Sequence, residues 1–288
     1  PKTLHVDLRK DAQSNRVIVE ENLNEEIGPH AIEALEKYGF FELTSAQDIA
    51  LSNGNGLSYT VPVYDENLFS PPKNKSEFKR FLNLAIQVTK SISAVHQAGH
   101  CFGIINDERF LIDENGNLVV IGLGAIRKEY DGLSLTEYGK SAYRYVAPEF
   151  NSRTVHKPDH RADFYGLGIL LNFWLTGSYF VDGADGQGIM HQHLTKNYKE
   201  PKKCLWKNTG IYEIITGLLR KNPSERYQSA NGIIRDLTTL KTNQDSGNNS
   251  QLSELSINHN PGVLSLNTFL HERENELAQL IKCYEKVQ

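Results

Sequence analysis

Hydrophobic residues recur at helical intervals over residues 76–95. The apolar positions are three or four residues apart, which places them on one face of an α-helix; they are Phe78, Leu82, Ala85, Val88, Ile92 and Val95. Ser76 lies directly before this pattern and is the expected N-cap. Phe164–Leu175, in contrast, is apolar on almost every side, which is typical of a buried central helix.

Shorter apolar runs, separated by turn-forming residues, predict strands in the first quarter of the chain. We expect strands over Leu4–Arg9, Arg16–Glu20, Phe40–Ile49 and Leu57–Tyr64. A short helix is predicted over Pro29–Tyr38, between the second strand and the third. This order predicts a small β-rich region that precedes the long helix.

A tight hairpin is predicted over Phe110–Gly124. Two short apolar runs flank Asn115-Gly116, a dipeptide that strongly favours a two-residue turn. Asp113 stands at the start of this Asp-Glu-Asn-Gly turn, where its side chain can accept hydrogen bonds from the backbone.

Two further motifs follow the hairpin. Tyr145–Phe150 reads YVAPEF, and Arg161–Gly177 reads RADFYGLGILLNFWLTG. In order and spacing, the hairpin and these motifs resemble the large lobe of a eukaryotic-type protein kinase. The resemblance implies an α+β, protein-kinase-like bilobal fold, with a reduced β-rich small lobe over residues 1–66 and a mainly helical large lobe over residues 67–241.

The catalytic loop of that family carries the pattern H-R-D-x-x-x-x-N. Its Asp accepts the proton of the substrate hydroxyl, and its Asn binds magnesium. The matching slots here hold Phe102, Gly103 and Ile104, then Asn106 in place of the usual Lys and Arg109 in place of the Asn. Ile104 has no lone pair to accept a proton, and Arg109 brings a positive charge to a cation site.

The metal-binding loop and the activation segment depart from the family pattern as well. The D-F-G triplet, whose Asp binds magnesium, reads G-L-G at residues 122–124, so Gly122 offers no carboxylate. The G-T pair before A-P-E is replaced by Ser141 and Ala142. Because these groups depend on one another in an active enzyme, their joint absence indicates a degenerate domain.

The strand that carries the phosphate-binding Lys of kinases aligns with Val17–Glu20. This register puts Glu20 in the Lys slot, where a carboxylate would repel phosphate; a register one or two residues away is the alternative. The G-x-G-x-x-G loop expected before this strand is not in the sequence. With no Lys to pair with, Glu33 and Glu36 of the short helix are expected to face solvent.

Structural residues of the family, in contrast, are kept. Asp163 stands at the helix start from which an Asp binds the backbone of the catalytic loop. Glu149 and Arg226 occupy the slots of a buried ion pair that joins A-P-E to a late helix. The resemblance therefore implies that the fold is used although the catalytic groups are lost.

Composition narrows the other possibilities. The chain has 288 residues, a formal net charge of −4 and no Lys/Arg-rich run, so a nucleic-acid surface is not indicated. No apolar run approaches the roughly 18 residues that cross a bilayer, and the polar N-terminus is not a signal peptide. Three scattered cysteines suit a reduced cytoplasm. We expect no metal site, and interpret His191 and His193 as part of a helical surface.

The last part of the chain resembles a particular architecture. Residues 218–237 (LLRKNPSERYQSANGIIRDL) are similar to the end of the kinase-like domain in large bacterial signalling proteins, which continue into an AAA-type ATPase and often a histidine kinase. A flexible linker is predicted over residues 242–262, followed by an amphipathic helix over residues 263–288 that resembles the start of that ATPase. Its apolar stripe predicts contact with an adjoining ATPase domain, another protein or a second copy of the chain; the stripe is Leu277, Leu280, Ile281, Tyr284 and Val287.

These features favour a catalytically inactive, protein-kinase-like (pseudokinase) module with a signalling, regulatory or protein-interaction role. One alternative is a regulator that binds ATP without magnesium and without phosphoryl transfer; otherwise no cofactor is expected. A second alternative is a non-standard Ser/Thr protein kinase in which Asp107 or Glu108 replaces the missing base. Neither nucleic acid nor a membrane is an expected partner.

Overall fold

The structure is a computed structural model that describes residues 6–10, 16–22, 29–44, 46–51, 56–62, 64–65, 70–128, 130, 135, 139–151, 157–201, 205–246 and 255–256. All of these belong to one compact unit, Pro1–Asn258. The amphipathic segment predicted over residues 263–288 lies outside the described residues. Within the described part, two antiparallel sheets are combined with helices, so the predicted α+β class is confirmed.

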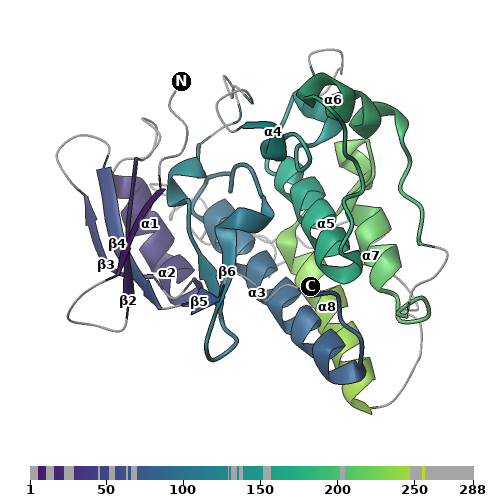
Figure 1. Cartoon of the computed structure of the whole chain (residues 1–288), viewed down its shortest axis with the longest axis horizontal. Coiled ribbons are helices and arrows are strands. Elements are labelled where there is room, and N and C mark those ends of the chain that lie inside the picture. The colour runs from purple at the N-terminus through teal and green to yellow at the C-terminus, as the bar shows by residue number, and fades with distance from the viewer. Residues whose placement is uncertain are drawn as a thin grey trace, which may run out of the picture. The chain divides into compact units, whose positions relative to one another are not determined.

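The first sheet is antiparallel and has the strand order β1-β2-β4-β3 (Figure 1). Its strands are β1 Val6–Lys10, β2 Arg16–Asn22, β3 Gln47–Leu51 and β4 Gly56–Pro62. Along β4, Leu57, Tyr59 and Val61 are buried and alternate with half-buried residues, the period of two that a strand imposes. Val19 pairs with Tyr59 and Glu21 with Leu57, so both residues of β2 face the buried side of the sheet.

Two helices, α1 Pro29–Lys37 and α2 Phe40–Leu43, come between β2 and β3. The strand predicted over Phe40–Ile49 is therefore wrong in its first half. Phe40 and Phe41 are both buried; consecutive strand residues point to opposite faces, whereas one helical turn can bury both. The hydroxyl of Thr44 closes the turn by donating to the carbonyl oxygen of Phe40 at 2.9 Å.

The second sheet has the order β5-β6-β7; its strands are β5 Tyr64–Asp65, β6 Phe110–Asp113 and β7 Leu118–Val120. The predicted hairpin between β6 and β7 is confirmed. Asp113 caps its turn, because its carboxylate accepts hydrogen bonds from the backbone nitrogens of Asn115 (2.9 Å) and Asn117 (2.7 Å). The strand predicted over Leu57–Tyr64 is divided, since β4 ends at Pro62 and Tyr64 pairs with β6.

Helices dominate the remaining described chain: α3 Lys75–Gln97, α4 Gly139–Ala142, α5 Arg161–Thr176, α6 Gly186–Thr195, α7 Ile211–Leu218 and α8 Ala230–Ser246. Short 3₁₀ turns occupy Asp107–Arg109, Leu123–Ala125, Pro148–Phe150 and Pro223–Glu225. Helices α3 and α8 lie side by side, and α5 contacts both α3 and α7 (Figure 1). Every residue of α5 from Ala162 to Asn172 is buried, so the predicted buried central helix is confirmed.

Helix α3 begins with a different cap from the one predicted. Asn74 is the N-cap, and its Oδ1 accepts a hydrogen bond from the backbone nitrogen of Glu77 at 3.0 Å. The Glu77 carboxylate accepts in return from Asn74 Nδ2 (2.5 Å) and from the backbone nitrogen of Lys73 (2.8 Å). This reciprocal arrangement resembles a capping box, except that Glu77 accepts from the backbone nitrogen of Lys73, the residue before the N-cap. Ser76 lies inside the first turn instead of before it.

Helix α8 continues through Ser246, and the chain returns to it at Ser256. The backbone nitrogen of Ser256 donates to Asp236 Oδ2 at 2.9 Å, and Arg235 Nε donates to Ser256 Oγ at 2.8 Å. The flexible linker predicted over residues 242–262 is therefore corrected in its described parts: residues 242–246 are helical, and Ser256 is anchored to a buried carboxylate. None of the described helices has the length and apolar character needed to cross a bilayer.

Candidate functional site

The slots of the H-R-D motif are filled by closely packed, largely apolar chain. Phe102 is fully buried and stacks on Phe110, with the ring centroids 5.7 Å apart; Ile104 is also buried. Gly103 has a φ of +90°, and a Cβ atom at this position would lie 2.1 Å from the carbonyl oxygen of Ala125. The close approach of these two backbone segments excludes a side chain at the Arg slot unless the backbone moves.

Asp163, in the first turn of α5, forms hydrogen bonds to the catalytic loop and to the residues around it. Its Oδ2 accepts a hydrogen bond from the backbone nitrogen of Phe102 at 2.8 Å and lies 2.7 Å from Nε2 of His96. Its Oδ1 accepts from the hydroxyl of Tyr130. Burial, together with the Asp163 charge, raises the pKa of Tyr130, so this hydroxyl stays protonated and can donate. Asp163 thus connects the start of α5 to the backbone of Phe102 and to His96 in α3.

Arg109 follows the same loop and is buried, although it carries a full charge. Its Nη1 donates to the carbonyl oxygens of Ile104 (2.7 Å) and Phe102 (3.2 Å), and its Nε donates to that of Ile121 (3.3 Å). The guanidinium carbon lies 4.5 Å from the centroid of the Phe102 ring, a cation–π contact. The positive charge is therefore bound by carbonyls of both the catalytic loop and the metal-binding loop.

Gly122, in the Asp slot of the D-F-G triplet, leaves the space that Arg109 occupies. A Cβ atom at residue 122 would lie 3.1 Å from Nε and 3.2 Å from Cγ of Arg109. A side chain at this position would require Arg109 to move, and the φ of +72° is one that residues other than glycine rarely adopt. The residue types at positions 109 and 122 are therefore sterically coupled, which the sequence alone did not indicate.

The inward-facing acid of β2 is Glu21 and not Glu20, so the predicted Lys slot is corrected by one residue. The Glu20 side chain is 46% exposed and lies 3.4 Å from the guanidinium of Arg9. Glu21 is only 4% exposed. Strand alternation contained this information, because Val19 faces the core and the side chain two positions later must face the same side.

Glu21 reaches from the first sheet to the metal-binding loop. Its carboxylate accepts hydrogen bonds from the backbone nitrogens of Leu123 and Gly124, both at 2.9 Å, and from the hydroxyl of buried Tyr59. Burial raises the pKa of Glu21; the Tyr59 hydroxyl, the two amides and the Arg109 charge oppose this shift. The carboxylate therefore accepts hydrogen bonds from two backbone amides of the loop that carries the D-F-G slots.

This set of groups does not fit a magnesium–nucleotide complex. At the two metal slots the chain has a glycine and a hydrogen-bonded guanidinium, Gly122 and Arg109, whereas magnesium prefers carboxylate and other oxygen ligands. Glu21 adds a buried acid where the family has a phosphate-binding Lys. Among the described contacts, Arg109 Nε and the backbone nitrogen of Leu123 already donate to the chain's own oxygens.

The acids considered as substitutes for the base have other environments. Both carboxylate oxygens of Asp107 accept hydrogen bonds from tyrosine hydroxyls, Oδ1 from Tyr145 at 2.7 Å and Oδ2 from Tyr179 at 3.2 Å. Glu108 is exposed, and Asn106 is half-buried at the start of the 3₁₀ turn. Asp107 thus links the loop to the activation segment and to the chain after α5.

Glu149 and Arg226 form a buried, bidentate ion pair. Arg226 Nη1 donates to Glu149 Oε1 at 2.6 Å and Nη2 donates to Oε2 at 2.7 Å. The two side chains are 1% and 0% exposed, respectively. This geometry is the strong form of an Arg–carboxylate contact. Glu149 lies in the 3₁₀ turn Pro148–Phe150, and Arg226 directly follows the 3₁₀ turn Pro223–Glu225 instead of lying in the late helix that was predicted.

The two histidines of α6 differ from the expected helical surface. His191 is exposed, but His193 is fully buried: its Nδ1 lies 2.9 Å from the Tyr165 hydroxyl and its Nε2 lies 2.8 Å from the Tyr143 carbonyl oxygen. Burial lowers the pKa of His193 to about 4. Among the described residues, no group of three or more His, Cys, Asp or Glu side chains is arranged to hold a metal ion.

The fold and the retained structural residues agree with a comparison with known families. The family model described as the protein kinase domain matches residues 9–236. The chain therefore belongs to the protein kinase family.

The similar proteins include two named as histidine kinases and one named as a probable serine/threonine-protein kinase. The chain is 35% identical over 118 residues to Hybrid signal transduction histidine kinase G of Dictyostelium discoideum, covering 40% of this chain and 3% of the relative. It is 29% identical over 190 residues to Peroxide stress-activated histidine kinase mak3 of Schizosaccharomyces pombe (61% and 8%). It is 23% identical over 254 residues to Probable serine/threonine-protein kinase PknB of Corynebacterium glutamicum (84% and 38%). The chain thus spans only a small part of the length of these relatives.

Proposed function

We propose that this protein kinase domain is catalytically inactive, a pseudokinase that serves as a regulatory or protein-interaction module in signalling. The observation that carries the proposal is the buried guanidinium of Arg109, bound to carbonyls of both the catalytic loop and the metal-binding loop. A fixed positive charge between these loops opposes a magnesium ion at the same point.

The chemistry of phosphoryl transfer supports the proposal. The reaction depends on positioning and on charge neutralisation by metal ions, with a base that accepts the substrate proton. A positioned base contributes about 10²–10⁴-fold to a rate, and Ile104 offers none. Gly122 contributes no metal ligand, and the buried Glu21 repels phosphate. These losses act on different parts of the same reaction.

The relatives support a place in signalling. Two of them are named as histidine kinases and are far longer than the matched region. We propose that the domain regulates an adjoining domain, such as an AAA-type ATPase, or a partner protein in the cytoplasm. The apolar stripe of Leu277, Leu280, Ile281 and Tyr284 is the proposed contact, either with that partner or with a second copy of the chain.

Nucleotide binding is tested by the melting temperature of the chain with and without ATP and magnesium. A ligand at 100 times its dissociation constant adds about 2.7 kcal/mol of stability, which raises the melting temperature by several degrees for a domain of this size. We expect no shift under any of these conditions, while an active Ser/Thr kinase measured in parallel shifts with ATP and magnesium.

Two results would contradict this expectation in different ways. A shift that needs magnesium, together with transfer of labelled phosphate to the chain or to a generic substrate, would establish a non-standard Ser/Thr kinase. A shift without magnesium and without transfer would establish the nucleotide-binding regulator. Both measurements use the unmodified chain, so neither outcome depends on whether a variant folds.

A further inference from the structure

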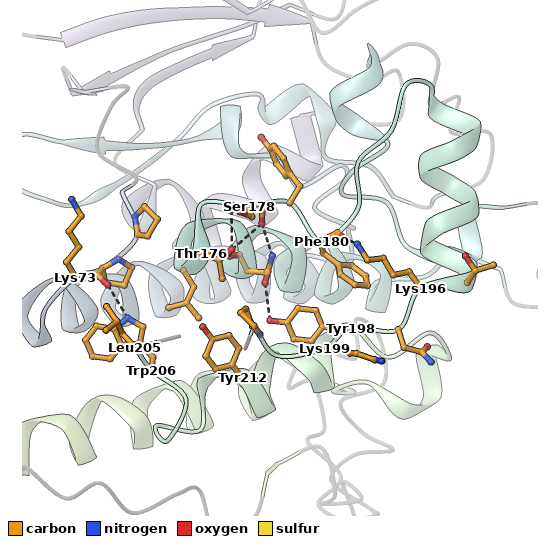
Figure 2. A pocket seen from close by; sticks show the side chains of 18 residues that line it. Lys73, Thr176, Ser178, Phe180, Lys196, Tyr198, Lys199, Leu205, Trp206 and Tyr212 are labelled. Atoms are coloured by element: carbon orange, nitrogen blue, oxygen red, sulfur yellow. Dashed lines mark hydrogen bonds between the residues drawn. The ribbon is translucent and has the colours of Figure 1, made fainter. Parts of the chain in front are cut away.

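A groove crosses the helical part of the domain, and its lining includes no residue of the catalytic or metal-binding loop (Figure 2). Its volume is about 1020 Å³. The walls come from the segment before α3, from the end of α5 with the loop after it, and from the chain between α6 and α7. This volume reaches the upper limit of ordinary ligand pockets, roughly 300–1,000 Å³.

The floor of the groove is aromatic and held in place. Trp206 stacks on Phe78 with the ring centroids 4.1 Å apart, and its Nε1 donates to the carbonyl oxygen of Pro72 at 3.1 Å. The Tyr198 hydroxyl donates to Asn172 Oδ1 at 3.0 Å. Because these rings are fixed by the fold, a ligand would not have to order them on binding.

An exposed leucine lies at the edge of this floor. Leu205 is 73% exposed, which is the highest value for a large hydrophobic residue in the described part of the chain. It is labelled beside Trp206 in Figure 2. An apolar side chain that continues an aromatic floor into solvent is typical of a binding surface for another apolar group.

The charged side chains described at the rim of the groove are all positive. Lys73, Lys196 and Lys199 line the groove and are exposed, and no Asp or Glu is among the described residues that line it. Figure 2 shows Lys73 near one end of the groove, and Lys196 and Lys199 near the other. The chain as a whole has a net charge of −4, so this local excess of positive charge is not a general property of the protein.

We propose that this groove binds an extended acidic segment of a partner protein, in which aromatic or aliphatic side chains alternate with Asp or Glu. Its apolar side chains would lie on the floor between Leu205 and Tyr198, and its acids would meet the lysines at both ends. An apolar centre with a charged rim is the usual division of a peptide interface. The proposal does not depend on whether the chain binds a nucleotide elsewhere, at the catalytic and metal-binding loops.

Fluorescence anisotropy with three synthetic peptides tests the proposal. The probe is a labelled peptide of alternating Asp-Phe and Glu-Leu units; in one control every acid is Lys, and in the other every Phe and Leu is Ser. We expect saturable binding of the acidic, apolar peptide only, and weaker binding as salt is added. Absence of saturable binding, or equal binding of the Lys peptide, would overturn the proposal.

Charge reversal in the groove gives a second, independent readout. The variant Lys73→Glu/Lys199→Glu changes two exposed residues and is expected to weaken binding of the acidic peptide by about tenfold or more. Leu205→Ser is also expected to weaken peptide binding, because it removes an apolar contact at the edge of the groove floor. Lys90→Glu, on the exposed surface of α3 and outside the groove, is the matched control. Equal weakening by Lys90→Glu would show that the peptide does not bind in the groove. Self-association of the chain that Leu205→Ser abolishes would also overturn the proposal, because a second copy of the chain would then occupy the groove. Melting curves establish that each variant is folded.

Discussion

Among single residues, Arg109 shows how a charged side chain can become part of a core. Three backbone carbonyls and the face of Phe102 surround its guanidinium, so the cost of removing the charge from water is offset by charge-assisted hydrogen bonds. Burial raises the pKa of the Glu21 carboxyl group, and the Arg109 charge opposes this shift. In the proposed pseudokinase, the side chain that stands in the slot of a magnesium ligand binds the carbonyl oxygens of Phe102, Ile104 and Ile121.

The coupling between residues 109 and 122 can be measured with a double-mutant cycle. We expect Gly122→Leu to destabilise the domain strongly, because the new side chain meets Arg109 within 3.1–3.4 Å of its Cβ position. Arg109→Ala removes this obstacle, so the double variant should be more stable than the sum of the two singles predicts, by about 0.5–3 kcal/mol. Urea unfolding of the four proteins gives the coupling energy. Additive effects would show that the two sites are independent.

His193 predicts a pH dependence of stability. Its pKa of about 4 in the folded chain lies below the ordinary value of 6.5, so the unfolded chain binds a proton more readily. The stabilising contribution is complete above about pH 6.5 and is lost as the pH falls toward 4; by pH 5 the loss is about 2 kcal/mol. Urea unfolding between pH 7 and pH 5 measures it. His193→Gln should flatten this dependence, and His191→Gln, on the exposed side, should leave it unchanged.

Between elements, Arg226 connects three segments that are distant in sequence. Besides its pair with Glu149 in the 3₁₀ turn Pro148–Phe150, its Nη1 donates to the carbonyl oxygen of Arg161 at the start of α5 (3.1 Å). Its Nε and Nη2 donate to those of Arg220 (2.7 Å) and Lys221 (3.0 Å). The A-P-E turn, the central helix and the turn before α8 are therefore held by one side chain.

Removal of Arg226 should thus destabilise the whole domain. We expect Arg226→Met to cost about 3–5 kcal/mol, because it leaves the Glu149 carboxylate buried without its cation. The double variant Arg226→Met/Glu149→Met should recover part of this loss. In the exposed pair with Glu20, Arg9→Met should change stability by less than about 1 kcal/mol. Chemical denaturation compares the four proteins, and equal effects of the two arginine substitutions would contradict the assignment.

The elements that the sequence predicts well are those whose apolar pattern decides the structure. The long helix, the buried central helix and the Asn115-Gly116 hairpin were predicted from periodicity or turn chemistry and are confirmed. The strand over Phe40–Ile49 failed because a short apolar run does not distinguish a strand from a helical turn. The cap of α3 failed because Asn74 and Ser76 both precede the pattern, and only the position of Glu77 three residues after Asn74 favours the first.

Across the molecule, Glu21 links the first sheet to the metal-binding loop. Its two hydrogen bonds to Leu123 and Gly124 and its contact with Tyr59 join segments about a hundred residues apart. In the family this region is organised by a Lys and a nucleotide; here a carboxylate makes the connection within the chain. The two lobes are therefore tied together by the protein's own groups.

Hydrogen exchange should reveal this tie. In Glu21→Ala we expect faster exchange at the amides of Leu123 and Gly124 and in β2 and β4, because their shared acceptor and its packing are lost. Amides of α5, which is buried elsewhere in the core, should be unaffected. Glu20→Ala is the matched control, since that carboxylate is exposed and pairs only with a surface residue in the described chain. Unchanged exchange at residues 123 and 124 would contradict the role of Glu21.

For the candidate site, residue identity supports a prediction about lost groups but not about what replaces them. The loss of a base and of a metal ligand stays a prediction from Ile104 and Gly122, because neither side chain can do that chemistry. What fills the cleft depends on three-dimensional contacts: the sequence does not show that Arg109 turns inward to bind the carbonyls of both loops. The inward position of Glu21 could have been predicted from strand alternation, because Val19 faces the core and Glu21 lies two residues later.

The contact between Arg109 and Gly122 also restricts the order in which a metal-binding loop can be rebuilt. A carboxylate introduced at residue 122 meets the arginine, and an arginine removed first leaves three carbonyls facing an empty space. Gly103 adds a further obstacle, because an arginine there requires the backbone at Ala125 to move. We therefore expect each of these single substitutions to give a less stable protein. In evolution or in protein engineering that starts from this chain, the combination of Arg109 and Gly122 would therefore be difficult to reverse by one substitution at a time.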